Sequence, residues 1–313
     1  MKLAKDRQKA PEYTASVLVD AFPWIKTCTG KTIVIKYGGA AMVDEKLRDA
    51  VMSDIVMLKI MGVNPVLVHG GGKEINKNFE AWDIPVEFKN GYRVTTEDAM
   101  DVVKMTLIGK VNEELVSAMN RHGNLAVGVS GADANTILAE VKDPELGRVG
   151  NVVEVNPAYI QSLINADYIP VIASVGVGED GQAFNINADV VASEVASAIG
   201  AHKIIFLTDV DGYYQDFEDK DSLVSQMKLV EVKELLASGQ VSTGMIPKLE
   251  SCVRALDSGV PRAHIVNGAK PHSILTELLT TSGCGTVIYT TTAQVREEMA
   301  PLGLLASRLV ENM

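Results

Sequence analysis

The hydrophobic positions of this 313-residue chain follow two alternating patterns. Short uninterrupted apolar runs that end at glycine or aspartate are typical of strands buried on both faces of a parallel sheet. Between these runs, apolar residues recur every three or four positions, which predicts amphipathic helices. The pattern predicts strands at 32–37, 66–68, 124–129, 168–175, 203–208, 263–266 and 285–289, and helices at 11–25, 44–61, 73–82, 95–121, 157–166, 190–199, 244–256 and 273–279.

Alternation of strands and helices along the whole chain predicts an α/β fold with a central, mostly parallel sheet. Two segments depart from it. Residues 137–155 carry Pro144 and Gly147 in their middle and predict a β-hairpin. Residues 176–181 match the dinucleotide pattern GxGxxG, but no helix follows directly, so Asp180-Gly181 favours a hairpin turn over a dinucleotide site.

The most informative stretch is 63–73, VNPVLVHGGGK. Its apolar run stops at three glycines, and a helical pattern follows. Backbone N–H groups of such a loop and of the following helix bind anions, and the helix dipole strengthens that binding. A tight strand-to-helix turn is the alternative, but three consecutive glycines before a lysine favour a loop that holds a phosphoryl group.

Two lysines occupy positions where a cation is unfavourable unless it meets a partner or a ligand. Lys36 lies inside an apolar strand, two residues before Gly38-Gly39. Lys248 follows Pro247 in the first turn of a helix, where a cation opposes the helix dipole at a cost of about 0.3–1 kcal/mol. Either lysine could be paired within the protein, but both positions favour a bound anion.

Further polar residues follow the predicted strands. Arg93 precedes a helix start, where a carboxylate could meet both the helix dipole and a guanidinium fork, although a surface ion pair is the alternative. Asn185 precedes a helix whose first turn contains Asp189, a position that also suits simple capping. Asp209 and Asp211 follow another strand and could hold a metal ion or a ribose, or form a turn. Right-handed crossovers would gather these groups at one edge of the sheet.

Composition excludes several classes of function. A formal net charge of −11 with no basic block argues against nucleic acid or an anionic membrane as the main partner. The three cysteines are too far apart for a CxxC zinc pair and fit a reducing cytoplasm. Neither a signal peptide nor an apolar run of 18 residues is expected, and the length suits about two domain-sized units.

These motifs resemble the amino acid kinase family. The resemblance covers about residues 30–290 and implies a three-layer αβα sandwich. It also implies an N-terminal helical extension (1–29), a substrate-binding and dimerisation lobe (30–200), an ATP-binding lobe (201–290) and a C-terminal tail (291–313). The motifs that carry it are IKYGG (35–39), VHGGGK (68–73), NINAD (185–189), LTDVDG (207–212) and GMIPK (244–248).

Two further motifs, NGYRVT (90–95) and SGADANT (130–136), resemble the branch that phosphorylates the γ-carboxylate of N-acetyl-L-glutamate with ATP in arginine synthesis. In that branch, Lys36 and Lys248 would neutralise the transferring phosphoryl group and Asp189 would fix both lysines. Arg93 and Asn185 would hold the substrate, with Gly71 and Gly72 beside it. The resemblance implies backbone phosphate donors at Gly38, Gly39, Gly71 and Gly72, and a nucleotide near Asp209, Asp211 and Lys248.

The resemblance also implies ATP with Mg²⁺ held mainly by the nucleotide, and no metal site made of protein side chains. The segment 272–286 and the N-terminal helix resemble arginine-inhibited members, which assemble as hexamers. On that basis, arginine would bind near Tyr13, His272, Glu277 and Gly283. Two alternatives stay open: a kinase acting on aspartate, glutamate or carbamate, and a non-catalytic arginine-sensing module.

Overall fold

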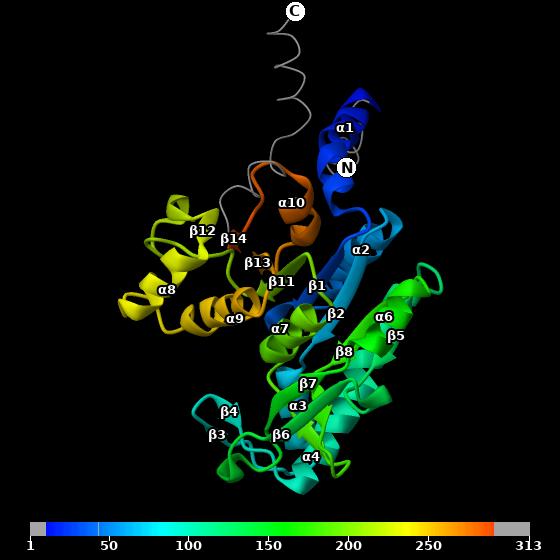
Figure 1. Cartoon of the computed structure of the whole chain (residues 1–313), viewed down its shortest axis with the longest axis vertical. Helices are drawn as coiled ribbons and strands as arrows, with labels where there is room; N and C mark the ends of the chain where they lie inside the picture. Colours follow the sequence, from blue (N-terminus) through cyan, green and yellow to red (C-terminus); the bar gives the residue numbers. More distant parts are fainter. Residues whose placement is uncertain (1–10, 43, 291–313) are drawn as a thin grey trace, which may run out of the picture.

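The computed structural model describes residues 11–42 and 44–290. Its centre is an eight-stranded sheet in the order β12-β14-β13-β11-β1-β2-β8-β5 (Figure 1). Every neighbouring pair is parallel except β13 and β14, so the mostly parallel sheet predicted from the sequence is confirmed. The strands are β1 (Thr32–Tyr37), β2 (Asn64–His69), β5 (Ala126–Val129), β8 (Ile169–Ala173), β11 (Lys203–Thr208), β12 (Gln226–Lys228), β13 (Arg262–Asn267) and β14 (Thr286–Tyr289).

Side chains alternate between the two faces of this sheet, as the pleat of a strand requires. In β1, Val34 packs with one helical layer, whereas Ile33 and Ile35 pack with the other. The predicted three-layer αβα sandwich is therefore confirmed. One layer holds α6 (Pro157–Asn165), α7 (Ala188–Ala198), α8 (Leu229–Ala237) and α9 (Ile246–Asp257), and the other holds α1 (Pro11–Cys28), α2 (Glu45–Ile60), α5 (Glu113–Asn120) and α10 (Ser273–Leu279).

Two small sheets flank the carboxyl end of the central strands. A four-stranded sheet has the order β10-β9-β6-β7, and β3 pairs with β4 in a two-stranded hairpin. The hairpin predicted for 137–155 and the hairpin turn at 180–181 are both confirmed. The strands are β3 (Phe88–Lys89), β4 (Tyr92–Arg93), β6 (Ile137–Val141), β7 (Gly150–Val155), β9 (Val175–Val177) and β10 (Ala183–Asn185).

The helix predicted at 95–121 differs in two respects. It begins at Glu97, capped by the Thr96 hydroxyl, which accepts a hydrogen bond from the Ala99 N–H. The Thr95 hydroxyl is engaged elsewhere: it donates to the Arg93 carbonyl and accepts from the Asn185 amide. The helix is also divided into α4 (Glu97–Lys104), the π-helical segment η2 (Met105–Asn112) and α5. A change of hydrogen-bond pattern of this kind has no signal in apolar periodicity.

Strand β12 and helix α8 were not predicted. Helix α3 (Gly72–Ala81), which follows the glycine loop, was predicted at 73–82. Short 3₁₀ turns occupy Gly39–Met42, Asp133–Asn135, Pro144–Leu146 and Lys220–Ser222.

The predicted lobe boundary near residue 200 falls between α7 and β11, and β11 pairs directly with β1. One sheet therefore runs through both predicted lobes, and the division into lobes stays a prediction. The tail predicted at 291–313 lies outside the described residues. Across residues 11–42 and 44–290, no helix is both long and apolar enough to cross a membrane.

Candidate active site

Lys36 belongs to the set of β1 side chains that face α7, together with Val34. Its ammonium lies 3.0 Å from Oδ1 of Asp189, in the first turn of that helix. Gly38 leaves room for this ammonium, because a Cβ at that position would lie 3.1 Å from Lys36 Nζ. The Lys36 and Asp189 side chains keep 15% and 33% exposure, so the pair borders open space.

That open space is a cavity of about 270 Å³, here named the glycine-loop cavity. Gly70, Gly71 and Gly72 line one side of it. The triple-glycine loop and the Lys36 side chain therefore lie at the same cavity, as predicted from their positions at the ends of neighbouring strands. The predicted residues that line the cavity are Lys36, Gly38, Gly39, Gly71, Gly72, Arg93, Asn185 and Asp189.

Arg93 is only 8% exposed although it carries a full charge. Its guanidinium stacks over the rings of Phe79 and Phe88, and its Nη2 donates a weak 3.3 Å hydrogen bond to the Gly72 carbonyl. Burial lowers the pKa of this arginine. Its Nη1 is buried without a partner in the structure. A buried donor of this kind costs free energy unless a ligand pairs with it, so Arg93 is suited to bind an anion from the cavity.

The opposite side of the cavity is the start of α7. Asn187 caps this helix, and its side-chain oxygen accepts hydrogen bonds from the N–H groups of Asp189 and Val190. The Asn185 amide donates a 3.2 Å hydrogen bond to the Thr95 hydroxyl. The Asn187 cap therefore holds the backbone at Asp189 in place. The Asn185 side chain lies at the cavity wall.

A second cavity of about 200 Å³, the lysine cavity, is lined by Lys248 and by the end of β11. Lys248 Nζ donates a 2.9 Å hydrogen bond to the Gly244 carbonyl and lies 3.4 Å from Asp209 Oδ1. The expectation that Asp189 holds both lysines is therefore not met in this structure. Asp189 pairs with Lys36, whereas Asp209, which is nearer to α9 in the chain, pairs with Lys248.

The two cavities share four lining residues, Lys36, Gly38, Gly39 and Asp189. A ligand in each cavity would therefore meet the other at the end of β1. Ammonium groups and backbone donors lie around this junction, so it is suited to a group that carries several negative oxygens.

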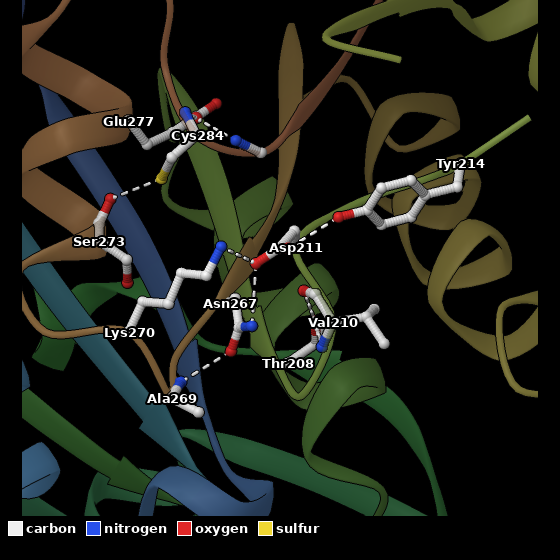
Figure 2. Close-up of polar contacts among 11 residues, drawn as sticks. Thr208, Val210, Asp211, Tyr214, Asn267, Ala269, Lys270, Ser273, Glu277 and Cys284 are labelled. Atoms are coloured by element: carbon white, nitrogen blue, oxygen red, sulfur yellow. Dashed lines mark hydrogen bonds and ion pairs between the residues drawn. The ribbon is translucent and has the colours of Figure 1, made fainter. Parts of the chain in front are cut away.

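Asp211 lies outside the lining of both cavities. Figure 2 shows its carboxylate between three side chains, Tyr214, Asn267 and Lys270, at 2.7, 2.9 and 2.6 Å. Burial acts to raise the pKa of Asp211, but these three donors outweigh it and lower the pKa. The carboxylate therefore ties the loop after β11 to the loop after β13, and direct contact with a nucleotide stays a prediction.

The predicted arginine-site residues are only partly brought together. Glu277 and Gly283 line a cavity of about 60 Å³, the Glu277 cavity, which Trp24 and Thr27 of α1 also line. His272 and Tyr13 do not line it. The His272 imidazole instead lies 2.7 Å from the buried Asp54 carboxylate of α2.

The Glu277 cavity also has three basic side chains that were not predicted, Lys203, Arg262 and His264. His264 lies 2.7 Å from Glu277, and its other ring nitrogen is buried without a partner in the structure. The signal was a histidine and flanking cations inside otherwise apolar strands, the same signal that singled out Lys36.

No cluster of three or more His, Cys, Asp or Glu side chains suited to a metal ion occurs among residues 11–42 and 44–290.

Comparisons with known proteins agree on one family. The profile of the amino acid kinase family matches residues 31–267. The chain is 49% identical over 276 residues to the acetylglutamate kinase of Caldanaerobacter subterraneus subsp. tengcongensis, covering 88% of this chain and 92% of that protein. It is 50% identical over 273 residues to the acetylglutamate kinase of Synechococcus sp. (strain RCC307), covering 87% and 92%.

Solved structures share the fold. An N-acetylglutamate synthase from Neisseria gonorrhoeae, complexed with coenzyme A and N-acetyl-glutamate, aligns with a TM-score of 0.78 at 24% identity. The alignment covers 89% of this chain but only 64% of the synthase chain. The protein smu.665 from Streptococcus mutans UA159 aligns with a TM-score of 0.68 at 31% identity, covering 83% of this chain and 99% of that chain.

Proposed function

The chain belongs to the amino acid kinase family, and on that premise we propose that it transfers the γ-phosphoryl group of ATP to the γ-carboxylate of N-acetyl-L-glutamate. The product would be N-acetyl-L-glutamyl 5-phosphate, an intermediate of arginine biosynthesis. Relatives that carry the name acetylglutamate kinase support this acceptor at 48–50% identity over nearly nine tenths of the chain. The structural observation that carries the proposal is the junction of the two cavities at Lys36 and Asp189.

The chemistry needs few groups from the protein. A carboxylate is already a nucleophile at neutral pH, so no general base is required. Phosphoryl transfer depends mainly on positioning and on neutralising charge on the transferring oxygens. Lys36 from the glycine-loop cavity and Lys248 from the lysine cavity supply that charge, while Asp189 keeps Lys36 in place.

Backbone N–H groups add to this neutralisation. The first N–H groups of α3, at Gly72 and just beyond, have no acceptor within the helix. Gly38 and Gly39 line both cavities and place main-chain atoms at the junction. These donors add to the charge neutralisation that the two lysines supply.

We assign the acceptor to the glycine-loop cavity. The unpartnered Nη1 of Arg93 is suited to the α-carboxylate of acetylglutamate, and the Asn185 amide lies on the same cavity wall. ATP then occupies the lysine cavity, with Asp209 beside it. Mg²⁺ fits this arrangement as a companion of the nucleotide, because the phosphate oxygens supply the ligands that the described side chains do not gather.

The test is an acceptor comparison with the purified protein. Phosphorylation of N-acetyl-L-glutamate, aspartate, glutamate and carbamate is measured as ADP release, with hydroxylamine trapping of the acyl phosphate. The proposal expects acetylglutamate to have the highest kcat/KM. Turnover of aspartate or carbamate without turnover of acetylglutamate would refute the proposed acceptor, and absence of any ATP-dependent transfer would refute the kinase.

We further propose that arginine inhibits the enzyme at the Glu277 cavity. Glu277 is almost fully buried, and its Oε2 accepts hydrogen bonds from the N–H groups of Cys284 and Gly285 at 2.8 and 2.9 Å. Burial acts to raise its pKa, but the hydrogen bonds from His264 and these two amides outweigh it and lower the pKa. The carboxylate is therefore held ionised, as recognition of a guanidinium requires.

A hexameric assembly through α1 is part of the same proposal. Tyr13, Val17, Leu18, Val19 and Phe22 are all about half exposed or more, which is unusual for apolar residues on one helix and suits docking onto a second copy. Trp24 and Thr27 of the same helix line the Glu277 cavity.

Deleting residues 1–26 tests both parts of this proposal. The shortened protein should keep its kcat, lose inhibition by arginine and form a smaller oligomer by multi-angle light scattering. An unchanged oligomer would contradict assembly through α1. Unchanged inhibition would contradict the link between α1 and the Glu277 cavity.

A further inference from the structure

His69 is a fully buried histidine at the end of β2, immediately before the triple-glycine loop. The substrate chemistry described above does not use it. Alternation along β2 places Val66 and Val68 toward α7, whereas Leu67 packs on the opposite face. His69 shares the face of Leu67, where η2 and α5 cover the sheet.

A chain of three hydrogen bonds passes through this imidazole. The Asn112 amide nitrogen, at the last residue of η2, lies 2.8 Å from the Val171 carbonyl and 2.9 Å from His69 Nε2. His69 Nδ1 lies 2.9 Å from the Gly70 carbonyl. These hydrogen bonds link the Val171 carbonyl in β8 to the Gly70 carbonyl in the loop, through the side chains of Asn112 and His69.

The ends of this chain fix its direction. The Val171 carbonyl can only accept, so the group facing it is the Asn112 NH₂, whose second hydrogen points to His69 Nε2. Nε2 therefore accepts, and Nδ1 carries the proton that it donates to the Gly70 carbonyl. Burial lowers the pKa of His69 to about 4, which keeps the ring neutral and preserves this single arrangement.

Neighbouring residues leave room for these hydrogen bonds. Gly128 on β5 faces Asn112, and a Cβ there would collide with the Asn112 side-chain oxygen. Asn112 also closes a π-helical segment, a backbone irregularity that occurs frequently at functional sites. The packing around Asn112 thus accommodates a polar group where an apolar side chain would be the ordinary choice.

We propose that His69 is a positioning residue for phosphoryl transfer: it holds the Gly70–Gly71 peptide so that the Gly71 N–H faces the glycine-loop cavity. The C=O and N–H of one trans peptide point in opposite directions. With the Gly70 oxygen drawn toward the imidazole, the Gly71 N–H is directed to the other side, where Gly71 lines the cavity. The reversed peptide would instead turn a carbonyl oxygen toward the phosphoryl oxygens and repel them.

Arg93 holds the other side of the same loop through the Gly72 carbonyl. The two contacts restrain the carbonyls before and after the Gly71 donor. A preorganised donor to a developing charge is typically worth on the order of 10²–10³ in turnover. This inference rests on the proposed kinase activity for its kinetic consequence, but its geometry is independent of the acceptor.

Two substitutions of His69 separate its two hydrogen bonds. In His69→Asn, the amide nitrogen takes the place of Nδ1 and can still donate to the Gly70 carbonyl. In His69→Gln, the amide takes the place of Nε2 and retains the contact with Asn112 but not the one with Gly70. We expect His69→Gln to lower kcat by about tenfold to a hundredfold, as for a misplaced donor, with KM for ATP changed less than about threefold.

We expect His69→Asn to lose less than about fivefold in kcat, since the donor to Gly70 is retained. Asn120→Ala is the matched control. Asn120 lies on the same helical run and holds backbone groups at Leu125 and Ala126, away from the loop. It should lower the melting temperature and leave kcat unchanged. Equal losses in both His69 variants, or full kcat in a folded His69→Gln, would overturn the proposal.

A measurement on the unmodified protein keeps the inference testable if a variant does not fold. Nitrogen-15 NMR of labelled histidine, with only five histidines in the chain, reports which ring nitrogen of His69 carries the proton. We expect a neutral ring protonated on Nδ1 at pH 6. A proton on Nε2, or a charged ring, would overturn the proposal. An inactive unmodified protein with the expected tautomer would instead refute only the kinase assignment.

Discussion

Replacing Arg93 by lysine keeps the positive charge but removes the planar fork of the guanidinium. In the structure, Arg93 lies between Phe79 and Phe88, with one terminal nitrogen on the Gly72 carbonyl and the other unpartnered beside the glycine-loop cavity. A lysine ammonium can satisfy one of these two directions but not both, because it is a point charge on a flexible stem.

The expected loss follows from the contact that lysine cannot make. A hydrogen bond to a charged group contributes about 1.5–3 kcal/mol. At 1.4 kcal/mol for each factor of ten, its loss raises KM for acetylglutamate by about 10- to 150-fold. Arg93 does not line the lysine cavity, so KM for ATP should change by less than about threefold.

Steady-state kinetics with each substrate varied in turn measure both constants. Arg148→Lys is the control, since Arg148 pairs with Glu97 at 2.6 Å and lies near Phe184 without lining either cavity. It should leave both KM values unchanged. A normal KM for acetylglutamate in Arg93→Lys, or equal increases for both substrates, would refute the assignment of Arg93 to the acceptor.

Three further predictions test charge, packing and pH dependence. Lys248→Ala should retain its circular-dichroism spectrum but lose on the order of 10²–10³ in kcat, and near-normal turnover would contradict its role. Gly128→Ala should lower the free energy of unfolding by about 1–3 kcal/mol in urea titrations, because its methyl group would displace the Asn112 amide, and unchanged stability would contradict the tight packing. The Lys110 hydrogen bond lowers the pKa of Glu74 below its ordinary 4.5, so the pair should stabilise the protein above that pH by no more than about 1 kcal/mol, since both side chains are partly exposed. Glu74→Gln should therefore lower the melting temperature at pH 7, and this deficit should shrink as the pH falls below 4.5 and through the lowered pKa of Glu74; a deficit that stays constant on acidification would contradict this reasoning.

Much of the fold was predictable because buried strands and amphipathic helices leave strong periodic signals. Strand β1 was predicted with its observed ends, and the hairpin at 180–181 was distinguished from a nucleotide loop because no helix followed it. The π-helical segment η2 was not predictable in this way, since its apolar positions also satisfy an ordinary helix.

The site was predictable where a residue broke a local rule. Lys36 in an apolar strand and Lys248 in a first helical turn both line the lysine cavity. The ion pairs within the site were not predictable, because they depend on how loops that are far apart in sequence come together in the fold. Asp209 rather than Asp189 holds Lys248, and Asp211 turns away to Tyr214 and its neighbours.

His272 and His264 illustrate the same limit at the Glu277 cavity. The resemblance implied His272 beside Glu277, but the His272 imidazole lies against Asp54 of α2. His264 reaches Glu277 from β13, because α10, which carries Glu277, packs against that strand.

The most direct test of the account is the binding of ADP, acetylglutamate and aluminium fluoride, which together mimic the transferring phosphoryl group. Isothermal titration should show that fluoride tightens ADP binding by roughly 10² or more in the unmodified protein. Lys36→Ala and Lys248→Ala should each bind ADP without most of that gain. Full tightening in either variant would contradict the claim that both ammonium groups converge on the phosphoryl group.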